Sequence, residues 1–137
     1  MTLSVPQKTT LEHAANKIGK PSPTDQEILW DMEERFWTSG FDNARATTAE
    51  NAIMIFPYPP GILQGDQIWH GLKRRTGWRS VAMTGRRATQ CGGIVILSYH
   101  ASAEKPDLPI YEALCASTYL NDAGGWLRTS HQQTLVV

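Results

Sequence analysis

The sequence predicts a single α+β domain in which helices come before an antiparallel sheet. Between residues 24 and 75, apolar side chains recur mainly at helical spacing, interrupted by one short strand-like run that prolines stop. After Gly77, four long segments rich in strand-forming residues follow one another, separated by turns that contain glycine, proline or asparagine. Helices grouped before strands indicate an α+β architecture, and 137 residues fit one domain with a sizeable core.

The main helix is expected to start at the capping box T24-D-Q-E27, whose first side chain can accept a hydrogen bond from a first-turn amide while its last reaches back. Glu33 and Glu34 are expected to lie off the apolar face, and Gly40 to end the helix. The apolar face itself should be formed by Ile28, Leu29, Met32 and Phe36, and Trp30 and Trp37 should widen it.

The other elements follow from the same patterns. A short helix is predicted from T9-T-L-E12 to Gly19, within an extension formed by residues 1–23 that precedes the domain at residues 24–137. Further elements are expected as a short helix over 41–49, a strand over 51–56 that P57-Y-P-P-G61 stops, a helix over 65–75, and strands over 78–90, 93–103, 108–120 and 125–136. The turn N121-D-A-G-G125 carries the clearest hairpin pattern.

Composition excludes several classes of protein. No apolar run approaches the length of a membrane span and no secretory signal is visible, so the prediction is a soluble cytoplasmic protein without a membrane partner. Residues 1–70 hold five basic and nine acidic side chains, and the remainder eight and four, so the surface should be polarised. The basic run over residues 73–87 contains one aromatic residue, Trp78, which argues against a nucleic-acid partner. Cys91 and Cys115 are expected to be buried, reduced thiols.

A family resemblance appears once these elements are in order. The helix ending in E34-R-F-W37, the strand A52-I-M-I-F-P57 and the final G125-W-L-R-T-S-H-Q-Q-T134 resemble the nuclear transport factor 2-like superfamily, in particular its SnoaL-like and ketosteroid-isomerase-like bacterial branch. The resemblance covers roughly residues 24–136. It implies a curved sheet wrapped around helices into a cone with an apolar cavity, a cystatin-like fold, and a homodimer formed through the sheet. Members include enzymes and non-enzymatic adaptors, so the fold leaves function open.

Known chemistries of this superfamily do not transfer residue by residue. The strand-borne aspartates of ketosteroid isomerases and the Asp-Arg-Asp set of epoxide hydrolases have no counterpart, because the acids after residue 70 fall in turns or at a strand start. The four histidines are scattered and the two cysteines isolated, so no metal site and no cofactor is expected.

Three functions therefore stay open. The first is a protein that binds a small apolar or amphipathic molecule, with the ligand-binding residues expected to be Tyr58, Trp69, Tyr99, Tyr111, Ser117, Tyr119 and Gln132. The second is a cofactor-independent isomerase or dehydratase in which His131, or alternatively His70, acts as base and Tyr58 polarises a carbonyl. The third is a non-enzymatic assembly module.

The final strand bears on all three. Strict alternation places Arg128, Ser130 and Gln132 on one face and His131 and Gln133 on the other. Neither face is purely apolar, so one is expected to meet the interior of the cone and the other a partner subunit.

Overall fold

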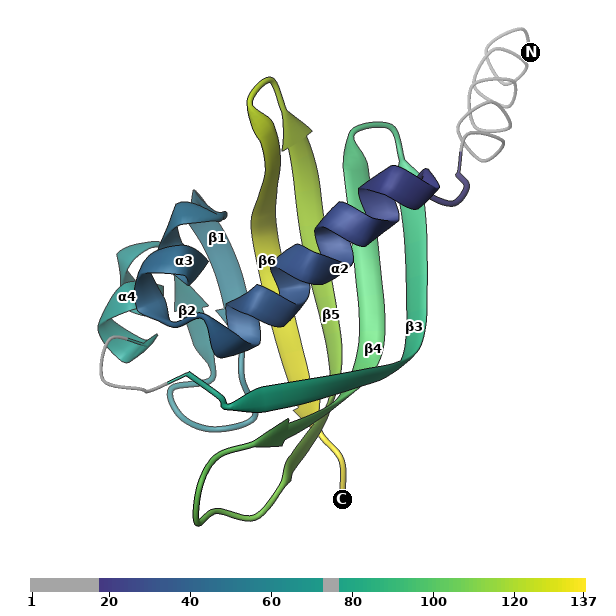
Figure 1. The fold of residues 1–137 in the computed structure, drawn as a ribbon. Helices are drawn as coiled ribbons and strands as arrows, with labels where there is room; N and C mark the ends of the chain where they lie inside the picture. The colour runs from purple at the N-terminus through teal and green to yellow at the C-terminus, as the bar shows by residue number, and fades with distance from the viewer. Residues whose placement is uncertain (1–17, 73–76) are drawn as a thin grey trace, which may run out of the picture.

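The computed structural model describes residues 18–72 and 77–137 (Figure 1). Helices and strands alternate little along the chain, as predicted. Their order is α2 (Pro23–Thr38), α3 (Phe41–Ala46), β1 (Thr48–Ile55), β2 (Ile62–Gln64), α4 (Asp66–Leu72), β3 (Ser80–Cys91), β4 (Ile94–Glu104), β5 (Tyr111–Asp122) and β6 (Gly125–Leu135). The short helix expected to start at T9-T-L-E12 lies outside the described residues. The α+β prediction is confirmed.

One curved sheet organises the domain. Its strand order is β2-β1-β6-β5-β4-β3, and every neighbouring pair is antiparallel except β1 and β6, which are parallel. Figure 1 shows α2 crossing the concave face of the sheet, while α3 and α4 cover the end formed by β1 and β2. The predicted meander of four strands is therefore present, and β1 and β2 extend it into an open mixed sheet.

Helix α2 starts earlier than the capping box at Thr24 predicted. Ser22 is its N-cap, its side-chain oxygen accepts a hydrogen bond of 3.1 Å from the Asp25 amide, and Pro23 occupies the first turn. Proline suits this place because its ring fixes a helical φ and it has no amide hydrogen to leave unsatisfied. Gly40, at φ 81°, follows the helix as predicted and allows the sharp turn into α3.

The buried face of α2 differs from the predicted apolar stripe. Ile28 is exposed, and the residues that face the sheet are Leu29, Trp30, Glu33 and Trp37. The prediction that Glu33 lies off the buried face is wrong: its side chain is 0% exposed. A charged group in this position needs partners, and they come from the sheet.

Two apolar clusters make up the core. The larger joins α2 to the concave face of β3, β4 and β5, around Leu29, Val95 and Leu97. The smaller joins α3 and α4 to β1 and β2, around Met54 and Ile68. Phe36 packs against both clusters, so the end of α2 lies where the two parts of the core meet.

A β-bulge changes the predicted faces of the last strand. Thr118 pairs with Ser130, but its neighbour Tyr119 pairs with Arg128, so Thr129 is the extra residue in β6. As a result Arg128 joins His131 and Gln133 on the buried inner face, whereas strict alternation had placed it with Ser130 on the other.

The two cysteines also differ from each other. Cys115 is a buried free thiol, as predicted. The prediction that Cys91 is buried is wrong: it is exposed at the end of β3, where the chain turns into β4. Among the described residues, no helix is both long and apolar enough to cross a bilayer.

Candidate functional site

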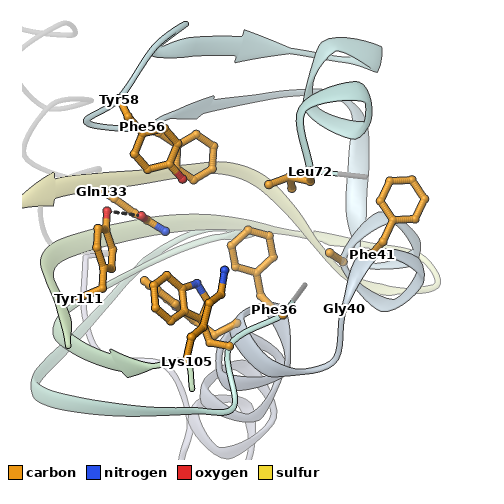
Figure 2. Close-up of a pocket in the computed structure, with 13 residues that line it drawn as sticks. Phe36, Gly40, Phe41, Phe56, Tyr58, Leu72, Lys105, Tyr111 and Gln133 are labelled. Carbon is orange, nitrogen blue, oxygen red and sulfur yellow. Dashed lines mark hydrogen bonds between the residues drawn. The ribbon is translucent and has the colours of Figure 1, made fainter. Parts of the chain in front are cut away.

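A partly enclosed cavity of about 300 Å³ lies between the end of α2, the α3–α4 end of the sheet and the inner face of β5 and β6 (Figure 2). This volume is at the lower end of the range for small-molecule sites. The cavity wall is mainly aromatic. It is lined by Phe36, Trp37, Gly40, Phe41, Ala44, Phe56, Tyr58, Leu72, Gly77, Trp78, Lys105, Tyr111 and Gln133.

Ring contacts hold this wall together. Phe56 and Tyr58 stack with centroids 5.4 Å apart, and Trp78 and Tyr111 stack at 5.2 Å. The Lys105 ammonium lies 4.3 Å from the centre of the Trp78 ring, a cation–π distance. Flat rings on two sides favour a flat apolar guest between them.

Polar atoms of the wall gather on the side formed by β5 and β6. The Tyr111 hydroxyl donates a hydrogen bond of 2.7 Å to Oε1 of Gln133, and Figure 2 shows Lys105 and Tyr58 bordering the same space. None of the described residues that line the cavity is a carboxylate or an imidazole. The hydrogen-bonding side chains among the described lining residues therefore include Tyr58, Lys105, Tyr111 and Gln133.

A second, closed group of polar side chains lies behind this wall, around Glu33. Its Oε2 accepts hydrogen bonds from Tyr99 and Ser117, each 2.5 Å, and its Oε1 accepts one of 2.6 Å from Tyr119. The Tyr99 hydroxyl in turn accepts a hydrogen bond of 2.9 Å from the Trp37 indole nitrogen. Three hydroxyl donors replace the water that the carboxylate loses on burial.

Arg128 supplies the opposite charge, also at 0% exposure. Its Nη2 lies 3.6 Å from Oε1 of Glu33, too far for a hydrogen bond, but it donates 2.6 Å to the Tyr119 hydroxyl that bridges the two groups. Nη1 donates to the hydroxyls of Thr47 and Thr48, which lie where α3 passes into β1. We call Glu33, Tyr99, Ser117, Tyr119, Arg128 and His131 the buried polar cluster.

Burial and charge shift the pKa values inside the buried polar cluster. Burial alone would raise the pKa of Glu33, but the His131 imidazole beside its carboxylate and the charge of Arg128 outweigh burial and hold that pKa well below its ordinary value. Burial, and then the Glu33 charge, raise the pKa of Tyr99 and of Tyr119 well above the usual range. The same causes raise the pKa of Cys115 to about 12. Glu33 is therefore ionised, and the hydroxyls around it stay protonated donors.

His131 connects this cluster to the cavity. Its Nδ1 lies 2.7 Å from the Ser117 hydroxyl oxygen, nearer than the 3.4 Å to Oε2 of Glu33. Its Nε2 lies 3.0 Å from Nε2 of Gln133, which itself lines the cavity. The imidazole is covered by the rings of Phe36 and Trp37 and reaches the cavity through the Gln133 amide.

The structure brings together some of the predicted site residues and separates others. Tyr58 and Tyr111 line the cavity, whereas Tyr99, Ser117, Tyr119 and His131 belong to the buried polar cluster. Trp69 is buried in the smaller apolar cluster, and Gln132 is exposed on the opposite, convex face of the sheet.

Four residues of the cavity and of the buried polar cluster were not predicted from the sequence: Glu33, Lys105, Arg128 and Gln133. Glu33 carried no pattern of its own among the acids of α2, and Arg128 was placed on the wrong face because the bulge at Thr129 has no sequence signature. Gln133 could have been found, since alternation puts it on the same face as His131. Lys105 sits in a turn, where a side chain's direction cannot be predicted from a period. Among residues 18–72 and 77–137, no group of three potential metal ligands gathers.

No protein-family model matches the chain, and no curated protein sequence matches it significantly. Solved structures do. A protein from Parabacteroides distasonis ATCC 8503, provisionally described as a ketosteroid isomerase, has a TM-score of 0.72 and 14% identity over 80% of this chain and 86% of its own. A nuclear transport factor 2-like protein from Cytophaga hutchinsonii has a TM-score of 0.69 and 9% identity, over 81% of this chain and 98% of its own. The CaMKII hub of S. rosetta has a TM-score of 0.67 and 12% identity, over 86% of this chain and 98% of its own.

Identities this low show the shape of the chain and leave its chemistry open. The open, curved mixed sheet with helices on its concave face is shared across these proteins. The chain therefore has the nuclear transport factor 2-like, cystatin-like fold that its sequence resembles.

Proposed function

We propose that this protein binds a small molecule with a flat apolar body in the aromatic cavity. The observation that carries the proposal is the cavity itself: about 300 Å³, walled by stacked ring pairs, with its hydrogen-bonding groups on one side. An apolar pocket with a few convergent polar groups is the usual form of a ligand site. The low exposure of the buried polar cluster behind it supports a rigid wall, because each hydroxyl there has a fixed partner.

The proposal is tested with naphthalene-2-carboxamide, a flat probe with one polar group. Binding should shift the indole resonances of Trp37 and Trp78 in proton–nitrogen NMR spectra, because both rings line the cavity. A Leu72→Trp variant replaces an aliphatic side chain at the cavity wall with a bulky indole that fills part of the cavity. It should weaken binding at least about tenfold. The matched control is Leu108→Trp in the exposed turn between β4 and β5, outside the cavity lining, which should bind as the parent does. Equal binding by both variants, or no shift in the two indoles, contradicts the proposal.

Acid–base chemistry by His131 with Tyr58 is the second candidate. One observation favours it: a continuous set of hydrogen bonds joins His131 to Gln133 and Tyr111 at the cavity wall. His131 does not itself line the cavity, so a proton would have to pass through the Gln133 amide or a water molecule. Isomerisation of a ketosteroid substrate would test it: turnover that His131→Gln abolishes supports it, and no turnover by the parent protein contradicts it.

We also propose that the convex face of the sheet forms a homodimer or a larger assembly. Six apolar side chains there are between 39% and 55% exposed, and pairing across β1, β4, β5 and β6 places them on one face: Ile53, Ile55, Ile94, Ile96, Leu114 and Leu120. The hub structure from S. rosetta supports an assembling role for this fold. Sedimentation of a stable monomer at micromolar concentration would contradict it, and Leu114→Glu should dissociate a dimer.

A further inference from the structure

A chain of hydrogen bonds leads from the cavity wall to the buried carboxylate. Tyr111 donates to Oε1 of Gln133 at 2.7 Å, and Nε2 of Gln133 lies 3.0 Å from Nε2 of His131. Nδ1 of His131 lies 2.7 Å from Ser117, which donates to Glu33 at 2.5 Å. Every link after Tyr111 is buried. The proton positions along this chain therefore depend on one another.

These contacts assign the proton of His131. The Ser117 hydroxyl gives its single hydrogen to Glu33, so it must accept from Nδ1 of His131. Gln133 uses its oxygen for Tyr111, so it turns its amide hydrogens toward Nε2 of His131, which accepts. His131 is thus a neutral imidazole protonated at Nδ1.

Charge balance agrees with this assignment. Glu33 and Arg128 carry one charge of each sign at 0% exposure, so the buried polar cluster is neutral when His131 is neutral. A proton added at Nε2 of His131 would leave one net positive charge in a dry interior. It would also place two donors face to face, unless the Gln133 amide turns by half a rotation.

That rotation would change what the cavity presents. With its oxygen toward His131, Gln133 would direct its amide hydrogens toward Tyr111 and the cavity. An anion seated against Gln133 would accept these hydrogens and offset the added positive charge. A neutral ligand with a carbonyl oxygen would also accept these hydrogens, but it would not offset the added positive charge. The Lys105 ammonium, on the same cavity wall, favours the same sign of ligand.

We propose that the cavity prefers flat apolar ligands carrying a carboxylate, and that their binding is coupled through Gln133 to uptake of a proton by His131. This rests on the proposed function. The proton comes from solvent and forms the Nε2–H bond of His131. The ligand's negative charge then restores neutrality across the cluster and the cavity.

The other charged or titratable groups around His131 come from several elements. From α2, Oε2 of the ionised Glu33 lies 3.4 Å from Nδ1 of His131, and the permanently charged Arg128 of β6 lies 3.6 Å from the other carboxylate oxygen. From β4 and β5 come Tyr99, Cys115 and Tyr119, whose raised pKa values keep them neutral. The remaining contacts are rings, from Phe36, Trp37 and Phe56.

The test compares naphthalene-2-carboxylate with naphthalene-2-carboxamide, which differ little except in charge. Calorimetric titrations at about pH 7.5 in two buffers of different ionisation enthalpy measure the protons taken up. The carboxylate should take up close to one proton per molecule bound and the amide none. Between about pH 6 and pH 8 the carboxylate's affinity should fall by up to about tenfold per unit as pH rises, while the amide's stays constant.

Nitrogen NMR of isotopically labelled histidine gives a direct reading that requires no variant. Free His131 should show one protonated and one unprotonated ring nitrogen, and the carboxylate complex two protonated nitrogens. His131→Gln should remove the pH dependence of carboxylate binding, and His100→Gln, on the exposed face, should preserve it.

The outcomes separate the two proposals. If both probes bind alike with no proton uptake and His131 nitrogen signals do not move, the coupling is overturned while cavity binding stands. If neither probe moves the indoles of Trp37 and Trp78, the proposed function fails and the coupling fails with it. Preference for the carboxylate with proton uptake supports both.

Discussion

The concave face of the sheet carries two neighbouring regions that solve opposite problems. In the buried polar cluster, the Glu33 carboxylate is surrounded by three hydroxyl groups and the opposite charge of Arg128, all of them buried. The cavity beside it leaves about 300 Å³ open between aromatic rings. Both draw on α2 and β6, and the residues between them are Phe36, Trp37 and Gln133.

The contrast shows how one inner face can be rigid and hollow at once. The buried charges of Glu33 and Arg128 are tolerated because each has several hydrogen-bonding partners and the two offset each other. Removing one of the two charges would leave the other buried without compensation. The cavity wall needs few such partners, because apolar rings that border empty space lose only van der Waals contacts. Stability is therefore expected to depend on the cluster and ligand recognition on the cavity.

The largest test of this contrast is Glu33→Gln. It keeps the shape of the side chain but leaves Arg128 buried without its counter-charge, so it should lower the free energy of unfolding by about 3–5 kcal/mol. Urea denaturation measures this. The matched control is Glu34→Gln, one residue along the same helix and exposed, which should change stability by less than about 0.5 kcal/mol. Equal effects would show that the buried charge pair is not a main source of stability.

A second test uses acid. The pKa of Glu33 in the folded protein lies below its ordinary value of 4.5, so its stabilising effect is complete above that pH and is lost as the pH falls toward the lower folded value. The stability difference between the parent and Glu33→Gln should accordingly be constant near neutral pH and shrink below about pH 4.5. Unfolding curves of both proteins over this range measure it, and a difference that grows in acid would contradict the assigned direction.

The smallest expected effect comes from the same substitution made in each region. Tyr99→Phe removes a hydrogen bond to a buried carboxylate and the acceptor of the Trp37 indole, so a loss of about 1.5–3 kcal/mol is expected. Tyr111→Phe removes a hydrogen bond to the neutral amide of Gln133 at the cavity wall, for which about 1 kcal/mol is expected. Thermal unfolding compares the two. A larger loss from Tyr111→Phe would reverse the division of roles between cluster and cavity.

Much of the fold could be predicted because its elements are set by near neighbours. The hairpin turn at N121-D-A-G-G125, the glycine that ends α2 and the alternation of β5 all depend on residues a few positions apart. In β5 the alternation is regular: Ala113, Cys115, Ser117 and Tyr119 are all buried on one face. Boundaries were less certain, since Ser22 rather than Thr24 caps α2.

The site was predicted only in part, for a different reason. Tyr58 and Tyr111 were placed near a cavity and line it, but no local pattern distinguishes Glu33 from the exposed acids beside it. Its hydroxyl partners lie 66, 84 and 86 residues further along the chain. A single extra residue in β6 then moved Arg128 onto the inner face.

By itself, then, the sequence determined the order of helices and strands, the turns between them and the general shape that follows from packing one against the other. Local periodicity and backbone preference are sufficient for that, because both act over a few residues. Only the tertiary structure decided that Glu33 is a buried charge, that Arg128 is its counter-charge, and that Gln133 joins His131 to the cavity. Those facts depend on which distant side chains meet in a dry interior, where an unpaired charge is too costly to persist.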